Sequence, residues 1–145
     1  MFPELSALEN LLVVSAAPFE VARHKALDLL RFVTLDRLQD EYAGNLSYGQ
    51  QKLLEFIRVL MTDPELILLD EPAAGVNRTL LNDLLAAITR LRDQGKTILI
   101  VEHDMKVVMG LCETVFVLDY GKKIAEGSPG AIQGDERVIE AYFGR

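Results

Sequence analysis

Features that mark secreted, membrane-spanning and nucleic-acid-binding proteins are scarce in this sequence. It contains a single cysteine, Cys112, which cannot form an internal disulfide, so a reducing cytoplasm is its natural setting. Its longest apolar stretches, such as residues 11–19, reach only about half of the roughly 20 residues that a bilayer requires. The first residues also lack the positive charge of a signal peptide. We therefore expect a cytoplasmic chain that inserts no segment of its own into a membrane and has a membrane role only through partner chains.

Positive charge is in deficit as well. Fifteen Lys and Arg residues stand against 22 Asp and Glu residues, giving a formal net charge of −7 over 145 residues. Because no cluster of basic residues relieves this excess, we expect no direct binding of nucleic acid. Hydrophobic residues make up 50% of the chain and charged residues 26%, which predicts an ordered globular protein with a real core.

The apolar pattern predicts helices first, followed by strands that alternate with helices. Residues 1–62 form the predicted helical section, and residues 63–145 form a predicted α/β section with a parallel sheet. The apolar runs at 66–69 and 97–101 are continuous, which is typical of strands buried on both faces. The expected helices are a short one opened by a capping box at Ser6 and Glu9, then 19–33, 50–61, 79–92, 104–111, a small one after Ser128 and Pro129, and 136–143, with further strands at 115–118 and 123–125.

Two adjacent carboxylates follow the first apolar strand, in the run Ile67 to Pro72. Ligand sites in open parallel sheets lie beyond the carboxyl ends of the strands, where Asp70 and Glu71 are expected. In phosphoryl-transfer sites the first such carboxylate holds Mg²⁺ and the second orients and deprotonates the attacking water. A strand that simply ends in an acidic turn is the alternative for this segment taken alone.

A second candidate lies upstream, where Ser47, Tyr48, Gly49 and Gln50 open a predicted helix. A serine followed by a glycine at a helix N-terminus can bind an anion, because backbone N–H groups and the helix dipole face it and glycine permits close approach. The alternative is a serine N-cap followed by a flexible glycine. His103, just after the strand at 97–101, is a third candidate: if the two strands are neighbours, it lies at the same sheet edge and reaches a γ-phosphate oxygen. A lone histidine after a strand is otherwise a structural residue.

Taken in order, these motifs resemble an ATP-binding-cassette (ABC) ATPase. Leu46–Gln50 resembles the signature motif of that family, Ile67–Glu71 the Walker B motif, Pro72–Asn77 the D-loop, and His103 the switch histidine. The same segments, together with the tail Val138–Gly144, resemble the ATPase subunits of branched-chain amino-acid importers. Tyr48 stands where glycine is commonest in the family and Asn77 where aspartate is, and both are found in this subgroup.

The resemblance implies a P-loop NTPase-like cassette and a set of roles. Ser47, Tyr48, Gly49, Gln50 and Asn77 are implied to bind ATP, Asp70 to hold Mg²⁺, Glu71 to act on the attacking water and His103 to sense the γ-phosphate. It also implies a second ATPase cassette, with which ATP is shared, and transmembrane permease subunits, so the chain is expected at the inner face of the cell membrane.

The P-loop of such a cassette, G-x-x-x-x-G-K-[ST], is missing from the sequence. Gly95-Lys96-Thr97 has the right ending, but Arg90 occupies the position of the first glycine, and a strand follows instead of a helix. The chain is therefore expected to be the C-terminal portion of a cassette, beginning at the helical subdomain and inactive alone. In the family's sheet the P-loop strand lies between the strands at 97–101 and 115–118, so the hairpin at 115–125 is expected to lack a parallel neighbour. The alternatives are a stand-alone partner that lends its signature motif to a complete cassette, and a soluble ABC ATPase of repair or translation.

Overall fold

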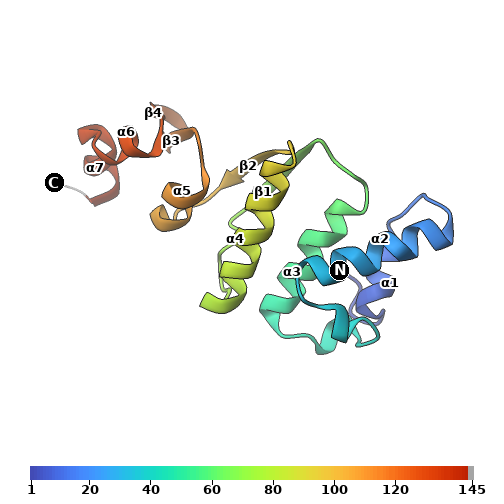
Figure 1. Ribbon diagram of the computed structural model, residues 1–145. Coiled ribbons are helices and arrows are strands. Elements are labelled where there is room, and N and C mark those ends of the chain that lie inside the picture. Colours follow the sequence, from blue (N-terminus) through green and yellow to red (C-terminus); the bar gives the residue numbers. More distant parts are fainter. Residues whose placement is uncertain (144–145) are drawn as a thin grey trace. The chain divides into compact units, whose positions relative to one another are not determined.

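The computed structural model describes residues 1–143 as two compact units, one comprising Met1–Val101 and the other beginning at Glu102 (Figure 1). The first unit contains four α-helices and a pair of strands, and the second contains three α-helices and a hairpin. The elements of the first unit are α1 (Ala7–Leu12), α2 (Phe19–Phe32), α3 (Tyr48–Leu60), β1 (Leu66–Asp70), α4 (Arg78–Asp93) and β2 (Thr97–Val101), with short 3₁₀ turns at Asp36–Leu38 and Ala43–Asn45. Those of the second are α5 (Met105–Leu111), β3 (Val115–Asp119), β4 (Lys122–Gly127), α6 (Pro129–Gln133) and α7 (Glu136–Phe143).

Helices α1, α2 and α3 pack together around leucine and isoleucine side chains. Apolar residues recur on one face of each helix, and the largest that become fully buried are Leu11, Leu30, Leu53, Leu54 and Ile57. The predicted capping box is confirmed at α1, where the Ser6 hydroxyl accepts from the Glu9 N–H and a Glu9 carboxylate oxygen accepts from the Ser6 N–H. Nearby, the fully buried Asn10 holds the N-terminal segment by accepting from the Phe2 N–H at 2.8 Å and donating to three carbonyl oxygens.

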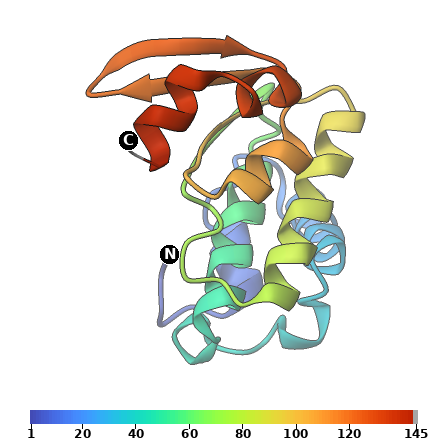
Figure 2. The same ribbon diagram turned by 90° about the vertical axis from the view of Figure 1, so that its left-hand side faces the viewer.

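Strands β1 and β2 run parallel, with Leu66 opposite Thr97 and Asp70 opposite Val101. The two strands are thus neighbours, the condition on which the prediction for His103 depends. The prediction that both faces of these strands are buried is wrong. Alternate side chains at Leu66, Leu68, Leu99 and Val101 are more than half exposed, whereas Ile67 on the opposite face is only 1% exposed. The reason is that α4 packs against β2 on one face of the pair, while no layer of the unit covers the other. Helix α4 runs beside α3 in the same unit (Figure 2).

The second unit is built on an antiparallel hairpin. Strand β3 pairs with β4 through a tight turn in which Tyr120 and Gly121 both have positive φ. One face of the hairpin packs with α6 and α7 through Val117, Ala125, Ile132 and Val138. The other exposes Phe116 and Leu118, and β3 has no parallel neighbour among the described residues, as expected.

The helix ends in this chain follow the local signals. Asp104 caps α5, Ser128 caps α6 with Pro129 in its first turn, and Gly95 adopts φ +89° just past α4. Cys112, which closes α5, is half-buried, and this burial raises the pKa of its thiol. The tail segment Val138–Gly144 extends one residue beyond the described chain. No helix in residues 1–143 has both the length and the hydropathy needed to cross a membrane.

Contacts across the predicted boundary at 62/63 tie α2 and α3 to α4. The Arg90 guanidinium stacks 4.1 Å from the centre of the Phe32 ring and donates to the Phe32 carbonyl oxygen at 2.9 Å. Just past the boundary, Lys96 donates to Asp63 at 2.8 Å, and this hydrogen bond holds the pKa of the Asp63 carboxyl below its usual value. The compact units therefore divide at 101/102, and the division into a helical section of residues 1–62 and an α/β section of 63–145 stays a prediction.

Adjacent residues on opposite faces of β1 are expected to respond oppositely to substitution. Ile67→Ala should destabilise the first unit by about 2–5 kcal/mol, because it leaves a cavity in a packed core. Leu68→Lys should change the free energy of unfolding by less than about 0.5 kcal/mol and reduce aggregation, because it places a charge on a bare apolar face. Urea unfolding and light scattering measure the two effects. Equal losses of stability at the two positions, or a wild-type chain that melts sharply and never aggregates, would contradict this account.

Candidate functional site

The start of α3 carries a second capping box, formed by Ser47 and Gln50. The Ser47 hydroxyl oxygen accepts from the Gln50 N–H at 3.4 Å, and the Ser47 N–H donates to Gln50 Oε1 at 2.9 Å. The box uses acceptor atoms of both side chains, so the Ser47 O–H and the Gln50 amide N–H groups are left to donate outward. The N-cap interpretation and the anion-binding interpretation of this motif are therefore compatible.

Gly49 lies in the first turn of α3 and is buried against α4. A Cβ built on Gly49 would lie 2.5 Å from Leu80 Cδ1 and 3.5 Å from Leu80 Cβ. Because Gly49 has no side chain, α4 can pack closely against α3 at this position. The packing of Leu80 is a second reason for a glycine at this position, and the close approach of an anion expected from the sequence stays a prediction. The backbone N–H of Gly49, in the first turn of a helix, still has no acceptor within the helix.

Asp70 and Glu71 lie where β1 ends, as predicted. Both are exposed, and the Glu71 N–H donates to the Val101 carbonyl oxygen at 2.9 Å, extending the pairing of β1 and β2 by one bond. Glu71 adopts φ +44°, a left-handed conformation that disfavours residues with a side chain by roughly 1–2 kcal/mol. Such strain is concentrated at functional sites, where the surrounding structure holds the residue in place. The Ala74 N–H closes the turn by donating to the Glu71 carbonyl oxygen at 3.0 Å.

The loop from Pro72 to Asn77 connects this turn to α4. Its middle lies against Tyr48, the first residue of α3. Gly75 has φ +71°, and a Cβ built there would lie 2.9 Å from Tyr48 Cε1. Asn77 caps α4 by accepting from the Leu80 N–H at 3.0 Å. Because an aspartate would accept the same bond, the capping role explains why asparagine serves at this position.

His103 is the predicted site residue that belongs to the second unit. It is exposed and lies two residues beyond the end of β2, and its N–H donates to Glu102 Oε2 at 3.1 Å. The structure thus brings the Ser47–Gln50 turn together with the Gly75–Leu80 segment, and it places Asp70 and Glu71 at the end of the neighbouring strand. That His103 shares the edge of the sheet with these carboxylates stays a prediction.

Residues 1–143 contain no group of three His, Cys, Asp or Glu side chains that could hold a metal ion. Mg²⁺ is commonly bound by one or two carboxylates together with phosphate oxygens and waters, so the role predicted for Asp70 does not require such a group. An exposed carboxylate at a strand end fits this mode of binding.

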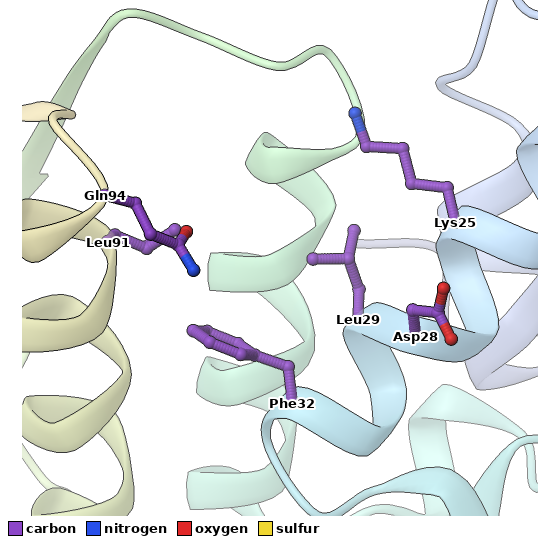
Figure 3. Close-up of a pocket in the computed structure, with 6 residues that line it drawn as sticks. All are labelled: Lys25, Asp28, Leu29, Phe32, Leu91 and Gln94. Atoms are coloured by element: carbon purple, nitrogen blue, oxygen red, sulfur yellow. The ribbon is translucent and has the colours of Figure 1, made fainter.

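A groove with a volume of about 410 Å³ lies between α2 and the end of α4 in the first unit (Figure 3). Leu29, Phe32 and Leu91 supply its apolar lining, and Lys25, Asp28 and Gln94 supply polar groups. None of the predicted site residues lines it, so the groove is separate from the candidate site.

An α/β chain with these motifs at its helix starts and strand ends defines part of a nucleotide-binding cassette. A family model for ABC transporters matches residues 1–74, about half of the chain, which therefore belongs to the ABC transporter family. A second model, described as the branched-chain amino acid ATP-binding cassette transporter, matches residues 122–145.

Similar proteins are ATP-binding proteins of transporters. The high-affinity branched-chain amino acid transport ATP-binding protein BraF of Pseudomonas aeruginosa is 37% identical over 99% of this chain, and the chain spans 64% of its length. LivG of Escherichia coli, which carries the same description, has the same identity and coverage. The crystal structure of the ADP conformation of MJ1267, an ATP-binding cassette of an ABC transporter, matches with a TM-score of 0.84 and 34% identity over 99% of this chain and 65% of that one. The predicted cassette fold is confirmed by this match.

Sequence reasoning missed two contacts of the site, Leu80 against Gly49 and Tyr48 against Gly75. An apolar residue in the first turn after Asn77 was the available signal for Leu80. The sequence alone gives no indication that α3 and α4 meet at their first turns.

The close approach at Gly49 generates a prediction on stability. Gly49→Ala should destabilise the chain by about 1–3 kcal/mol, because the new methyl group overpacks the contact with Leu80. Gly110→Ala is the matched control: Gly110 also lies in a helix, but nothing lies within 4 Å of its built Cβ, so alanine should stabilise by about 0.5–1 kcal/mol. Thermal or urea unfolding of both variants measures these changes in stability. Stabilisation by both would mean that the α3–α4 contact is loose.

Proposed function

We propose that the chain forms the signature-motif and Walker B part of an ATP-hydrolysing cassette in an importer of branched-chain amino acids. The observation that carries the proposal is the capping box of α3, whose unused hydrogen-bonding groups are donors, next to a loop that leads from two strand-end carboxylates. The names of the relatives, branched-chain amino acid transport ATP-binding proteins, support the substrate class.

Ser47, Gly49 and Gln50 would bind the γ-phosphate of an ATP held by a second cassette. The Ser47 hydroxyl, the Gln50 amide and the backbone N–H groups of the first turn can all donate to phosphate oxygens, and the helix dipole favours the negative charge. Tyr48 and Asn77 border this turn, Tyr48 through its place in the motif and Asn77 at the end of the adjoining loop.

Asp70, Glu71 and His103 would act on the nucleotide bound by their own cassette. Asp70 would hold Mg²⁺, which neutralises phosphate charge and aligns the phosphates for transfer. Glu71 would accept a proton from the attacking water, and the strained backbone at this residue is of the kind found at functional sites. His103 would donate to a γ-phosphate oxygen and so report its presence or loss.

The partners we propose are a second cassette and transmembrane permease subunits at the cytoplasmic face of the membrane. A solved dimer described as a post-hydrolysis state of the ATP-binding cassette MJ0796 bound to ADP and Pi is 29% identical over 88% of this chain, with a TM-score of 0.76 and 58% of that chain covered. That protein is a dimer bound to ADP and Pi, which supports the proposed pairing of two cassettes.

Without a P-loop in its sequence, the 145-residue chain is proposed to hydrolyse no ATP alone. A second candidate function follows from the same fact: a partner without a P-loop that supplies only its signature motif to a complete cassette. The capping box of α3 is sufficient for this candidate, since the donors of Ser47 and Gln50 would act in trans and would need no P-loop of their own.

The shared claim of both candidates is tested by complementation. We expect a complete cassette, such as the BraF relative with its signature serine replaced by alanine, to regain ATPase activity when this chain is added. Gln50→Glu should abolish the rescue, because glutamate keeps the capping box but replaces the amide donor with a negative charge. Glu9→Gln, a similar exchange in the capping box of α1, is the control and should rescue like the wild type. Rescue by Gln50→Glu would exclude the phosphate contact.

The intact mass of the polypeptide in its native cells separates the two candidates. A mass well above 16.2 kDa, with peptides that contain a P-loop, would identify a part of an ordinary transport ATPase. A mass that matches 145 residues, with co-purification of an intact cassette, would favour the partner that acts only in trans. Co-purification of permease subunits would support the importer in either case.

A further inference from the structure

We propose that Tyr48 is a positioning residue that holds the loop of residues 72–77 against the start of α3. The signature motif and the D-loop would then keep a fixed position relative to each other. The effect on ATP turnover rests on the function proposed above. The contact itself is a property of the first unit and needs no nucleotide.

The ring of Tyr48 occupies the space in which a side chain at Gly75 would lie. A Cβ built on Gly75 would lie 2.9 Å from Tyr48 Cε1 and 3.6 Å from both Cδ1 and Cζ, so one edge of the ring covers the glycine. Gly75 has φ +71°, a conformation that glycine adopts without strain. No other residue type would satisfy both the backbone conformation and the space beneath the ring.

The orientation of the ring is supported from α3 itself. Lys52, one helical turn further along, places its ammonium group 5.6 Å from the centre of the Tyr48 ring. Tyr48 therefore contacts both a cation on its own helix and the loop, although its side chain is 54% exposed. An exposed aromatic ring held by two contacts is suited to position a neighbouring loop.

Two further contacts fix the ends of the same loop. At one end the Glu71 N–H bonds to the Val101 carbonyl oxygen, and at the other Asn77 caps α4, whose Leu80 packs on Gly49. Of these three contacts, only that of Tyr48 with Gly75 joins the middle of the loop to the Ser47–Gln50 turn.

Hydrogen exchange of the 145-residue chain tests the contact directly. Tyr48→Ala should accelerate exchange of the Ala74 and Val76 amides, which bond within the loop, by about fivefold to tenfold. Tyr48→Phe, which keeps every ring atom in contact with Gly75, should leave their exchange unchanged. Peptides from α2 should not respond to either variant. Unchanged loop exchange in Tyr48→Ala, or equal acceleration throughout the first unit, would overturn the proposal.

Gly75→Ala provides a second perturbation from the loop side. It should accelerate loop exchange in the wild-type background and have a smaller effect when combined with Tyr48→Ala, because the steric conflict with the ring is then gone. If Gly75→Ala accelerated loop exchange equally in the wild-type and Tyr48→Ala chains, the proposed contact between Tyr48 and Gly75 would be wrong.

In the complementation assay, Tyr48→Ala should lower kcat more than it raises the KM for ATP, since a displaced loop impairs turnover rather than capture. A loss confined to KM would overturn the positioning role in turnover. If the wild-type chain gives no rescue, the proposed function fails, whereas the exchange experiments still decide on the contact.

Discussion

The close approach of α3 and α4 at their first turns is the constraint on which the candidate site depends. It exists because Gly49 has no side chain where Leu80 packs. The contact brings the Ser47–Gln50 turn beside the loop that descends from β1, and Asn77 ends that loop by capping the same helix that carries Leu80. Residues far apart in the sequence therefore become neighbours because Leu80 packs on Gly49, and no polar network between the two helices is needed.

Helix capping and anion recognition use different atoms of the same side chains, which resolves the choice between two interpretations of Ser47. The capping box of α1 can be compared with that of α3. Ser6 and Glu9 form a capping box of the same geometry at α1, but there the third residue is a carboxylate that offers no donor and repels anions. Gln50 provides the equivalent backbone bond at α3 and keeps two amide N–H groups for a ligand. The difference between a structural cap and a candidate phosphate site is thus one side-chain amide.

Local signals in the sequence predicted most of the elements and little of their burial. Capping residues, glycine and proline positions and apolar periodicity act within a few residues, which is why the helix starts at Ser6, Asp104 and Ser128 and the end near Gly95 were predicted correctly. The burial of β1 and β2 was wrong because it depends on the layers that pack on the sheet, and these are tertiary. The motif positions of Ser47, Asp70 and Glu71 could be predicted from their order along the chain. The contact of Tyr48 with Gly75 could not, because nothing local specifies which helix faces which loop.

The conflict between the strand sequences and their burial bears on how the chain functions. Strands with one face in water usually alternate apolar and polar residues, whereas Leu66–Leu69 and Ile98–Val101 are apolar at every position. Half of these side chains are exposed in the first unit, and Phe116 and Leu118 repeat the pattern in the second. Sequences and folds are normally consistent at every level, so an apolar run with a bare face indicates a strand adapted to a further layer. Because contiguous exposed apolar faces mark sites of association, we expect these leucines to be covered when the chain acts in the cassette proposed above.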